Sequence, residues 1–143
     1  MSDIATCPQC GTRNRVPSSS TGKPRCARCQ TWLPWIVNAG DGDYTAVVDQ
    51  STVPVLVDLW APWCGPCRTV SPALEQLAGE FAGRLKLVKV DVDKAPQTSS
   101  RLEVQAVPTL LITRSGKILA RRAGAAPVAA LRAWLEESLV PEA

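Results

Sequence analysis

The sequence predicts an α/β domain, a mixed sheet flanked by helices, behind a small cysteine-rich module. From Val53 onwards, apolar runs and helical patterns alternate in the order βαβαββα. The six cysteines form three Cys-x-x-Cys pairs, and two of these pairs fall within the first 29 residues. A chain of 143 residues with 45% hydrophobic residues suits one globular domain and a small appendage. We therefore divide it into residues 1–35, here called the ribbon, and residues 36–143.

The ribbon carries Cys7-Pro8-Gln9-Cys10 and Cys26-Ala27-Arg28-Cys29, separated by a turn-rich stretch over residues 18–24. Four thiolates in two short knuckles match the tetrahedral preference of Zn²⁺, so the spacing predicts a zinc ribbon with one structural zinc ion per chain. Gly11 permits a positive φ after the first knuckle, whereas the second knuckle is followed by Gln30, a mild departure from this use of glycine. Few apolar residues lie here, so the metal must supply most of the folding energy. Reversible disulfides within the quartet are the alternative.

The charge of the chain is unevenly divided. Residues 1–35 hold five Lys and Arg against Asp3, a net +4, and the rest holds 11 against 12, a net −1. Four thiolates with one Zn²⁺ would reduce the ribbon to about +2, too little to predict nucleic-acid binding. The ribbon ends in an apolar strip that should pack on the second domain, formed by Trp32, Leu33, Trp35 and Ile36.

Composition also points to a compartment. No stretch approaches the roughly 18 to 20 apolar residues of a membrane span, so no membrane partner is expected. Residues 1–7 lack the basic start and apolar core of a signal peptide, which favours the cytoplasm. Thiols are reduced there, so paired cysteines indicate metal and redox chemistry. Because the chain has no histidine, acid and base chemistry must fall to carboxylates, lysine or thiols.

The second domain follows from periodicity and turn residues. The helix after Cys64 has its apolar positions on one face, and Pro72 within it predicts a kink or, alternatively, a boundary. The run over 85–92 is apolar on both faces, as in a central parallel strand. Pro127 suits a first helical position, and Leu131, Trp134, Leu135 and Leu139 form the buried stripe of that last helix. The expected elements are a short lead-in that can be helical at 44–49, strands at 53–60, 85–92, 109–113 and 117–122, with a hairpin turn at 114–116, and helices at 64–81, 96–102 and from 127.

The stretch Trp63-Cys64-Gly65-Pro66-Cys67 carries the chemistry. A strand that ends in a turn places Cys64 at the start of a helix, where free backbone N–H groups and the helix dipole stabilise a thiolate. We expect Cys64 to be the exposed nucleophile and Cys67, one turn later, to resolve the mixed disulfide. The pair thus predicts a redox-active disulfide. Half of a zinc site or a static disulfide are the alternatives, and Pro66 with the strand-to-helix setting argues against both.

Residues 57–67, followed by Val107-Pro108-Thr109 and Gly124, resemble the thioredoxin family over roughly residues 36 to 140. With its ribbon, the chain is most similar to bacterial members that carry an N-terminal zinc ribbon. The resemblance implies a thioredoxin fold and a protein disulfide reductase that a flavin-dependent thioredoxin reductase recycles. The glycine and proline between the cysteines imply a reducing poise.

Two charged residues lie in apolar strands. Asp58 falls within the run that leads to the cysteines, and Lys89 shares a strand face with Leu85 and Leu87. The resemblance implies that Asp58 handles the proton of Cys67, directly or through water, and that Lys89 tunes Asp58. The alternative is an ion pair that only orients the strands.

The resemblance also implies a substrate surface. The matching proline, Pro108, is cis in this family and leaves the backbone of Val107 free to pair with an extended substrate strand. Trp60 should pack beneath this surface. The implied substrate-binding residues are Trp63, Gly65, Pro66, Val107, Pro108, Gly124 and Ala125.

The expected partners are disulfide-containing proteins and thioredoxin reductase, and no oligomer is implied. The competing hypothesis is a zinc-dependent adaptor or redox sensor whose thioredoxin-like domain reports oxidation to a ribbon-bound partner.

Overall fold

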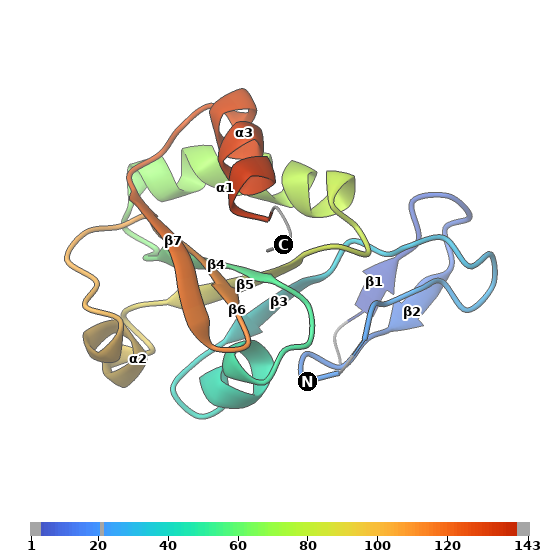
Figure 1. Ribbon diagram of the computed structural model, residues 1–143, viewed down its shortest axis with the longest axis horizontal. Coiled ribbons are helices and arrows are strands. Elements are labelled where there is room, and N and C mark those ends of the chain that lie inside the picture. Colours follow the sequence, from blue (N-terminus) through green and yellow to red (C-terminus); the bar gives the residue numbers. More distant parts are fainter. Residues whose placement is uncertain (1–3, 21, 140–143) are drawn as a thin grey trace.

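The computed structural model describes residues 4–20 and 22–139. Asp3, counted above in the charge of the ribbon, and the first residues used to judge a signal peptide lie outside this range. In the ribbon, β1 (Ile4–Thr6) and β2 (Arg13–Arg15) form an antiparallel pair beside the larger domain (Figure 1). Residues 18–20 and 22–24 form no strand, as expected for a turn-rich stretch.

The larger domain is built on a five-stranded sheet in the order β3-β5-β4-β6-β7. Strands β3 and β4 both run parallel to β5, and β6 and β7 are antiparallel to their neighbours. The predicted mixed sheet is thus confirmed. The strands are β3 (Ile36–Ala39), β4 (Val55–Trp60), β5 (Lys86–Asp91), β6 (Thr109–Arg114) and β7 (Lys117–Ala123).

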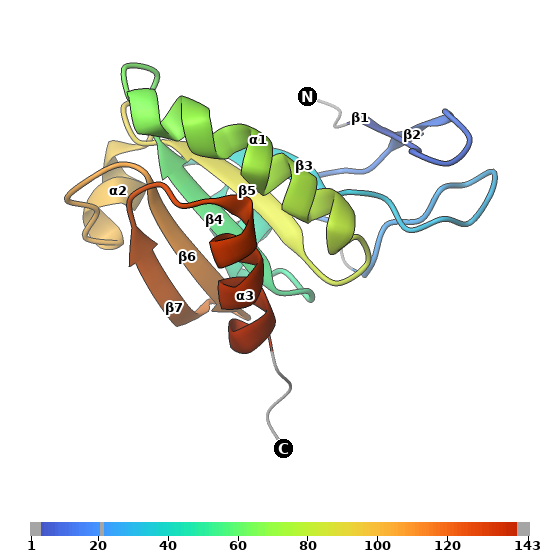
Figure 2. The same ribbon diagram turned by 90° about the horizontal axis from the view of Figure 1, so that it is seen from above.

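Helices cover both faces of this sheet. Helices α1 (Gly65–Glu80) and α3 (Val128–Ser138) pack on one face, and one π-helical turn, η1 (Thr45–Asp49), and α2 (Pro96–Arg101) lie on the other (Figures 1 and 2). Alternate strand residues serve the two faces: Leu56 packs in the core beneath α1, and Val57 packs in the core that contains η1. Asp58 follows Val57, so its side chain points toward α1.

The sequence missed β3. This strand has only four residues, and its burial pattern of exposed, buried, exposed and half-buried positions follows Ile36-Val37-Asn38-Ala39. Its formation depends on parallel pairing with β5, a contact distant in sequence. The other predicted boundaries fall within two residues of those observed, and Pro127 is the N-cap of α3 instead of its first residue. The alternative that Pro72 ends the helix is wrong, because α1 continues through it.

The ribbon shares a hydrophobic core with the larger domain. Leu33 is 0% exposed and Trp35 is 2% exposed, in one cluster with Cys26 of the ribbon and Val37 and Val88 of the sheet. The predicted docking of the apolar strip is thus confirmed for these two residues. Figures 1 and 2 place the ribbon at the end of α1 opposite to its N-terminus.

Two contacts fix this docking. Trp32 lies against Gly83, which has φ +82°, and a Cβ on Gly83 would lie 2.8 Å from the indole Cδ2. Lys86, which sequence reasoning overlooked, is 0% exposed. Its ammonium group donates to the carbonyl of Ser18 and, at 2.7 Å, to that of Val47, and it lies 4.3 Å from the centre of the Trp35 ring. The ribbon therefore supplies two partners of this buried cation, the Ser18 carbonyl and the Trp35 ring.

Candidate active site and cysteine cluster

The dithiol motif lies where β4 passes into α1. Cys64 is the N-cap of α1, with φ −88° and ψ 111°, and the backbone N–H of Cys67 donates to its Sγ at 3.1 Å. This is the helix-start position that favours a thiolate. Cys64 and Cys67 form a disulfide with a Cα–Cα distance of 5.3 Å. The predicted redox-active pair is therefore in disulfide geometry, and the alternative of a zinc half-site finds no second pair nearby among the described residues.

The expectation that Cys64 alone is exposed is wrong. Cys64 and Cys67 are each 4% exposed, so exposure does not distinguish them in the disulfide form. The two cysteines differ instead in their surroundings. Cys64 Sγ lies 3.6 Å from the carbonyl oxygen of Val107, at the surface implied for substrate, whereas Cys67 lines a cavity behind the motif.

This cavity has a volume of about 130 Å³ and is lined by Asp58, Trp60, Cys67, Arg68, Ser71 and Lys89. Asp58 is 2% exposed, and its Oδ1 has no hydrogen-bond partner among the described residues. Burial raises the pKa of Asp58 to about 6, against the opposing effect of the Lys89 charge. A carboxyl group with such a pKa gains and loses a proton near neutral pH, beside the sulfur that must do the same.

Lys89 is the cross-strand neighbour of Asp58 in the pairing of β4 with β5. It does not form an ion pair with Asp58 among the described residues, and its side chain is 17% exposed. The ammonium group instead donates to Ser71 Oγ at 2.9 Å and lies 3.6 Å from Glu75 Oε1. Sequence reasoning missed Ser71 and Glu75. Their spacing of four and eight residues from Cys67 puts them on the same helix face, which was the available signal.

The residues implied for substrate binding gather around Pro108. The Val107–Pro108 peptide bond is cis, and the N–H of Gly124 donates to the carbonyl of Pro108 at 2.9 Å, with φ +87° at Gly124. Val107 packs against the buried cluster that contains both active-site cysteines. Gly65, Pro66 and Ala125 are exposed.

Trp63 is the largest exposed apolar side chain near the disulfide, at 69% exposure. Its Nε1 donates to Asp93 Oδ2 at 3.0 Å, so Asp93 fixes the orientation of the indole. Asp93 was not anticipated from the sequence. Trp60 is half-buried and lines the cavity with Asp58, in agreement with its expected place beneath the surface.

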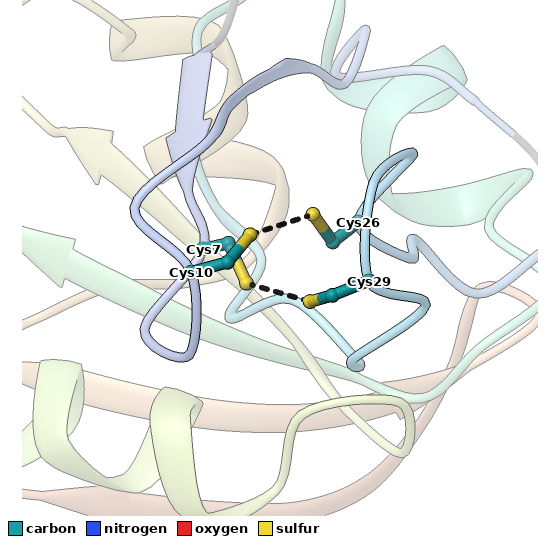
Figure 3. A group of neighbouring side chains, drawn as sticks. All are labelled: Cys7, Cys10, Cys26 and Cys29. Carbon is teal, nitrogen blue, oxygen red and sulfur yellow. Dashed lines mark hydrogen bonds between the residues drawn. The ribbon is translucent and has the colours of Figure 1, made fainter.

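The four ribbon cysteines form a second site (Figure 3). Their sulfur atoms all lie within 4.8 Å of one another, with 3.5 Å between Cys7 and Cys29 and 3.6 Å between Cys10 and Cys26. A tetrahedral zinc ion with Zn–S bonds near 2.3 Å requires sulfur atoms about 3.8 Å apart. The donor set therefore fits one Zn²⁺ ion.

The two knuckles repeat one geometry. Gly11 and Gln30 both take left-handed φ values, +74° and +67°, so the departure noted at Gln30 keeps the conformation that glycine adopts in the first knuckle. Their N–H groups donate to the carbonyls of Cys7 and Cys26 at 3.0 and 2.9 Å. The second cysteine of each knuckle lies near a threonine hydroxyl, at 3.1 Å for Thr12 and 3.2 Å for Thr31.

The thiols of this cluster differ in acidity. The backbone N–H of Cys29 lowers the pKa of Cys26 to about 6, and burial raises the pKa of Cys7 to about 11. One thiolate thus forms readily, and a bound cation would stabilise the others.

Within the described residues, no helix combines the length and the apolar character that a membrane span requires.

Comparison with known proteins supports this architecture. The Thioredoxin family model matches residues 34–137. A thioredoxin of Haemophilus influenzae is 39% identical over 104 residues, covering 73% of this chain and 97% of that protein. Thioredoxin C-2 of Corynebacterium nephridii is 40% identical with coverage of 73% and 96%, and the chloroplastic M-type thioredoxin of Chlamydomonas reinhardtii is 38% identical with coverage of 89% and 95%. The chain belongs to the thioredoxin family and is a thiol–disulfide oxidoreductase.

Proposed function

We propose that this protein reduces disulfides in other proteins, with Cys64 as nucleophile and Cys67 as resolving thiol. The Cys64 thiolate attacks one sulfur of the substrate disulfide, and the other sulfur leaves as a thiolate. Cys67, as a thiolate, then attacks Cys64 Sγ and releases the second substrate sulfur. Two electrons pass to the substrate, and the Cys64–Cys67 disulfide remains. The observation that supports this most strongly is the N-cap position of Cys64, with the Cys67 N–H 3.1 Å from its sulfur.

Asp58 is the base of the resolving step. It lines the same cavity as Cys67, and the pKa of about 6 lets it accept the Cys67 proton, directly or through water, at neutral pH. Lys89 tunes Asp58 from the neighbouring strand, at a position set by its hydrogen bond to Ser71.

The substrate surface comprises the residues around Pro108 that the family resemblance implied. Val107 offers main-chain groups to an extended strand that carries the target disulfide, and Trp63 supplies exposed apolar area. A flavin-dependent thioredoxin reductase returns the disulfide to the dithiol.

The ribbon completes the proposal. Its four cysteines bind one structural Zn²⁺, and their thiols suit a reducing compartment, the cytoplasm. The division into residues 1–35 and 36–143 is part of this proposal. It is supported by the start of β3 at Ile36 and by the family match from residue 34.

Trapping tests the chemistry. The Cys67→Ser variant should hold substrate proteins as mixed disulfides, whereas Cys64→Ser should hold none and lose reduction of a model protein disulfide. Mass spectrometry of the trapped species identifies the substrates. Equal trapping by both variants would refute the assigned order.

An adaptor or redox sensor is the second candidate, favoured by the core that the ribbon shares with the larger domain. Turnover separates the two functions. A reductase consumes many equivalents of a protein disulfide with NADPH and thioredoxin reductase, whereas a sensor is oxidised once and recovers slowly.

A further inference from the structure

The ribbon contains an open groove on the side of β2. Its volume is about 390 Å³, and it is lined by residues 12–17, by Ser20, residues 22–25 and Ala27, and by Trp35. The cysteine cluster does not account for this groove, because none of the four cysteines lines it.

Four cations line the groove, Arg13 and Arg15 from β2 and Lys23 and Arg25 from the opposite wall. Among the residues that the structure describes, no acidic residue lines the groove and none of the four cations forms an ion pair. A neighbouring hollow of about 300 Å³ shares Lys23 and adds Arg84 and Arg114, and none of its lining residues in the described part of the chain is acidic. Cations that converge on a concave surface in this way create a positive potential that attracts anions.

The backbone of the groove suits an extended ligand. Strand β2 pairs with β1 and with no other described strand, so one of its edges remains available for main-chain pairing. Arg13 and Arg15 are two residues apart and exposed, with Asn14 buried between them. Alternation in a strand places both guanidinium groups on one face, where they match acidic side chains spaced two apart on a partner strand.

We propose that this groove binds an extended, acidic segment of a partner protein. Arginine favours carboxylates because its planar guanidinium group can donate two parallel hydrogen bonds. Single-stranded nucleic acid fits less well, because bases require open aromatic faces. Neither tryptophan near the groove presents an open face. The Arg25 guanidinium group lies over the Trp32 ring, 4.1 Å from its centre, and Trp32 also contacts Gly83, whereas Trp35 is 2% exposed.

The groove is remote from the dithiol. The ribbon lies beyond the C-terminal end of α1, and Cys64 caps the other end of that helix (Figure 2). Binding here leaves the disulfide surface open, so the groove serves as an anchor in addition to the proposed reductase site.

Fluorescence anisotropy tests the proposal on the full, zinc-loaded chain. The probe is a labelled peptide of alternating glutamate and serine, and the control peptide has glutamine in place of glutamate. We expect saturable binding of the acidic peptide that weakens as salt rises, and no binding of the neutral one. Because the assay involves no turnover, its outcome is independent of the proposed reductase function.

Matched variants locate the site. The double variant Arg13→Gln/Arg15→Gln should weaken binding by roughly tenfold or more, since each charged hydrogen-bond partner contributes on the order of 1 kcal/mol or above. The variant Lys94→Gln/Lys117→Gln removes the same charge outside the groove and should bind as the parent does. Zinc content and tryptophan fluorescence show that each variant is folded.

Three results would overturn the proposal: binding of the neutral peptide with equal affinity, an equal loss in both double variants, or tighter binding of a single-stranded oligonucleotide than of the acidic peptide.

Discussion

The same Cys-x-x-Cys spacing occurs in two settings of this chain, with opposite chemistry. At the start of α1, Cys64 and Cys67 face each other and form a disulfide. In the ribbon, the close sulfur contacts join the two knuckles, at 3.5 Å between Cys7 and Cys29 and 3.6 Å between Cys10 and Cys26. Spacing brings two thiols near each other, and the backbone around them decides whether they bond to each other or share a metal ion.

The two regions also differ in how they use buried charge. The dithiol site keeps Asp58 at its own cavity with an unpartnered oxygen, which suits a group that must exchange a proton. The ribbon interface surrounds Lys86 with carbonyl oxygens and an indole ring, which suits a fixed contact. We therefore propose that the buried Asp58 serves reactivity, whereas the buried Lys86 serves docking.

The largest expected effect comes from removing zinc. Chelation should unfold the ribbon while the dithiol keeps its reactivity, because Cys64 caps the start of α1 and the ribbon lies beyond the other end of that helix (Figure 2). The larger domain should lose stability, however, because Lys86 loses the Ser18 carbonyl and the Trp35 ring. We expect a loss of about 3 kcal/mol in the free energy of unfolding, measured with urea.

Lys86→Met is the control for this comparison. It should destabilise the zinc-loaded protein, and it should reduce the additional loss that chelation causes, since no buried ammonium group remains to lose the Ser18 carbonyl and the Trp35 ring. Complete loss of turnover on chelation would contradict the independence of the two sites.

Asp58→Ala should stabilise the oxidised protein at neutral pH and slow turnover. The folded-state pKa of about 6 lies above the ordinary value of 3.8, so folding favours the protonated carboxyl group. The protonated Asp58 carboxyl group stabilises the folded state fully below pH ~4. This stabilisation is lost as the pH rises through about 6, and the free energy of unfolding is lower by about 3 kcal/mol above that pH.

Urea unfolding at pH 4 and pH 8 checks this linkage. The gain from Asp58→Ala should be present in full at pH 8 and largely absent at pH 4, where the carboxyl group is protonated in the folded state and only about half ionised in the unfolded state. A variant that is destabilised at pH 8 and fully active would contradict the role assigned to Asp58.

Gly83→Ala tests the contact between the regions. The new Cβ would meet the Trp32 ring at 2.8 Å and would require a left-handed backbone at alanine. We expect a loss of roughly 1–2 kcal/mol in stability and a change in tryptophan fluorescence. Gly116→Ala is the matched control, because Gly116 has the same φ of +82° and a Cβ there would make only ordinary contacts with Asp49, at 3.5 Å or more. Equal stability of the two variants would show that Trp32 does not fix the ribbon.

The smallest effect concerns Ser71. Replacement by alanine removes the hydroxyl that holds Lys89, leaving the ammonium group free to approach Asp58 and lower its pKa. The pH profile of mixed-disulfide resolution should therefore shift to lower pH, while the initial attack by Cys64 is unchanged. Ser71→Thr keeps a hydroxyl and should retain the parent profile. A shift of the profile to higher pH in Ser71→Ala would contradict the positioning role.

Sequence alone determined the elements with strong local patterns. The buried strands, the helix after Cys64 and both kinds of cysteine pair follow from periodicity, helix-start residues and thiol chemistry, all of which act over a few neighbouring residues. The family resemblance added the cis bond at Pro108 and the proximity of Lys89 to Asp58, and the structure shows these two residues as neighbours in register on adjacent strands.

Only the tertiary structure decided the features that depend on distant contacts. Strand β3 has too weak a pattern to be read alone and forms by pairing with β5. Lys86 and Lys89 stand in one strand, yet alternation sends the first toward the ribbon and the second toward α1, and only the packed neighbours reveal that Lys86 is the buried one. The sequence alone could not predict the partners of Lys89 on α1 or the burial of both active-site cysteines. Burial depends on how the helices and strands pack together and is not encoded by any single segment.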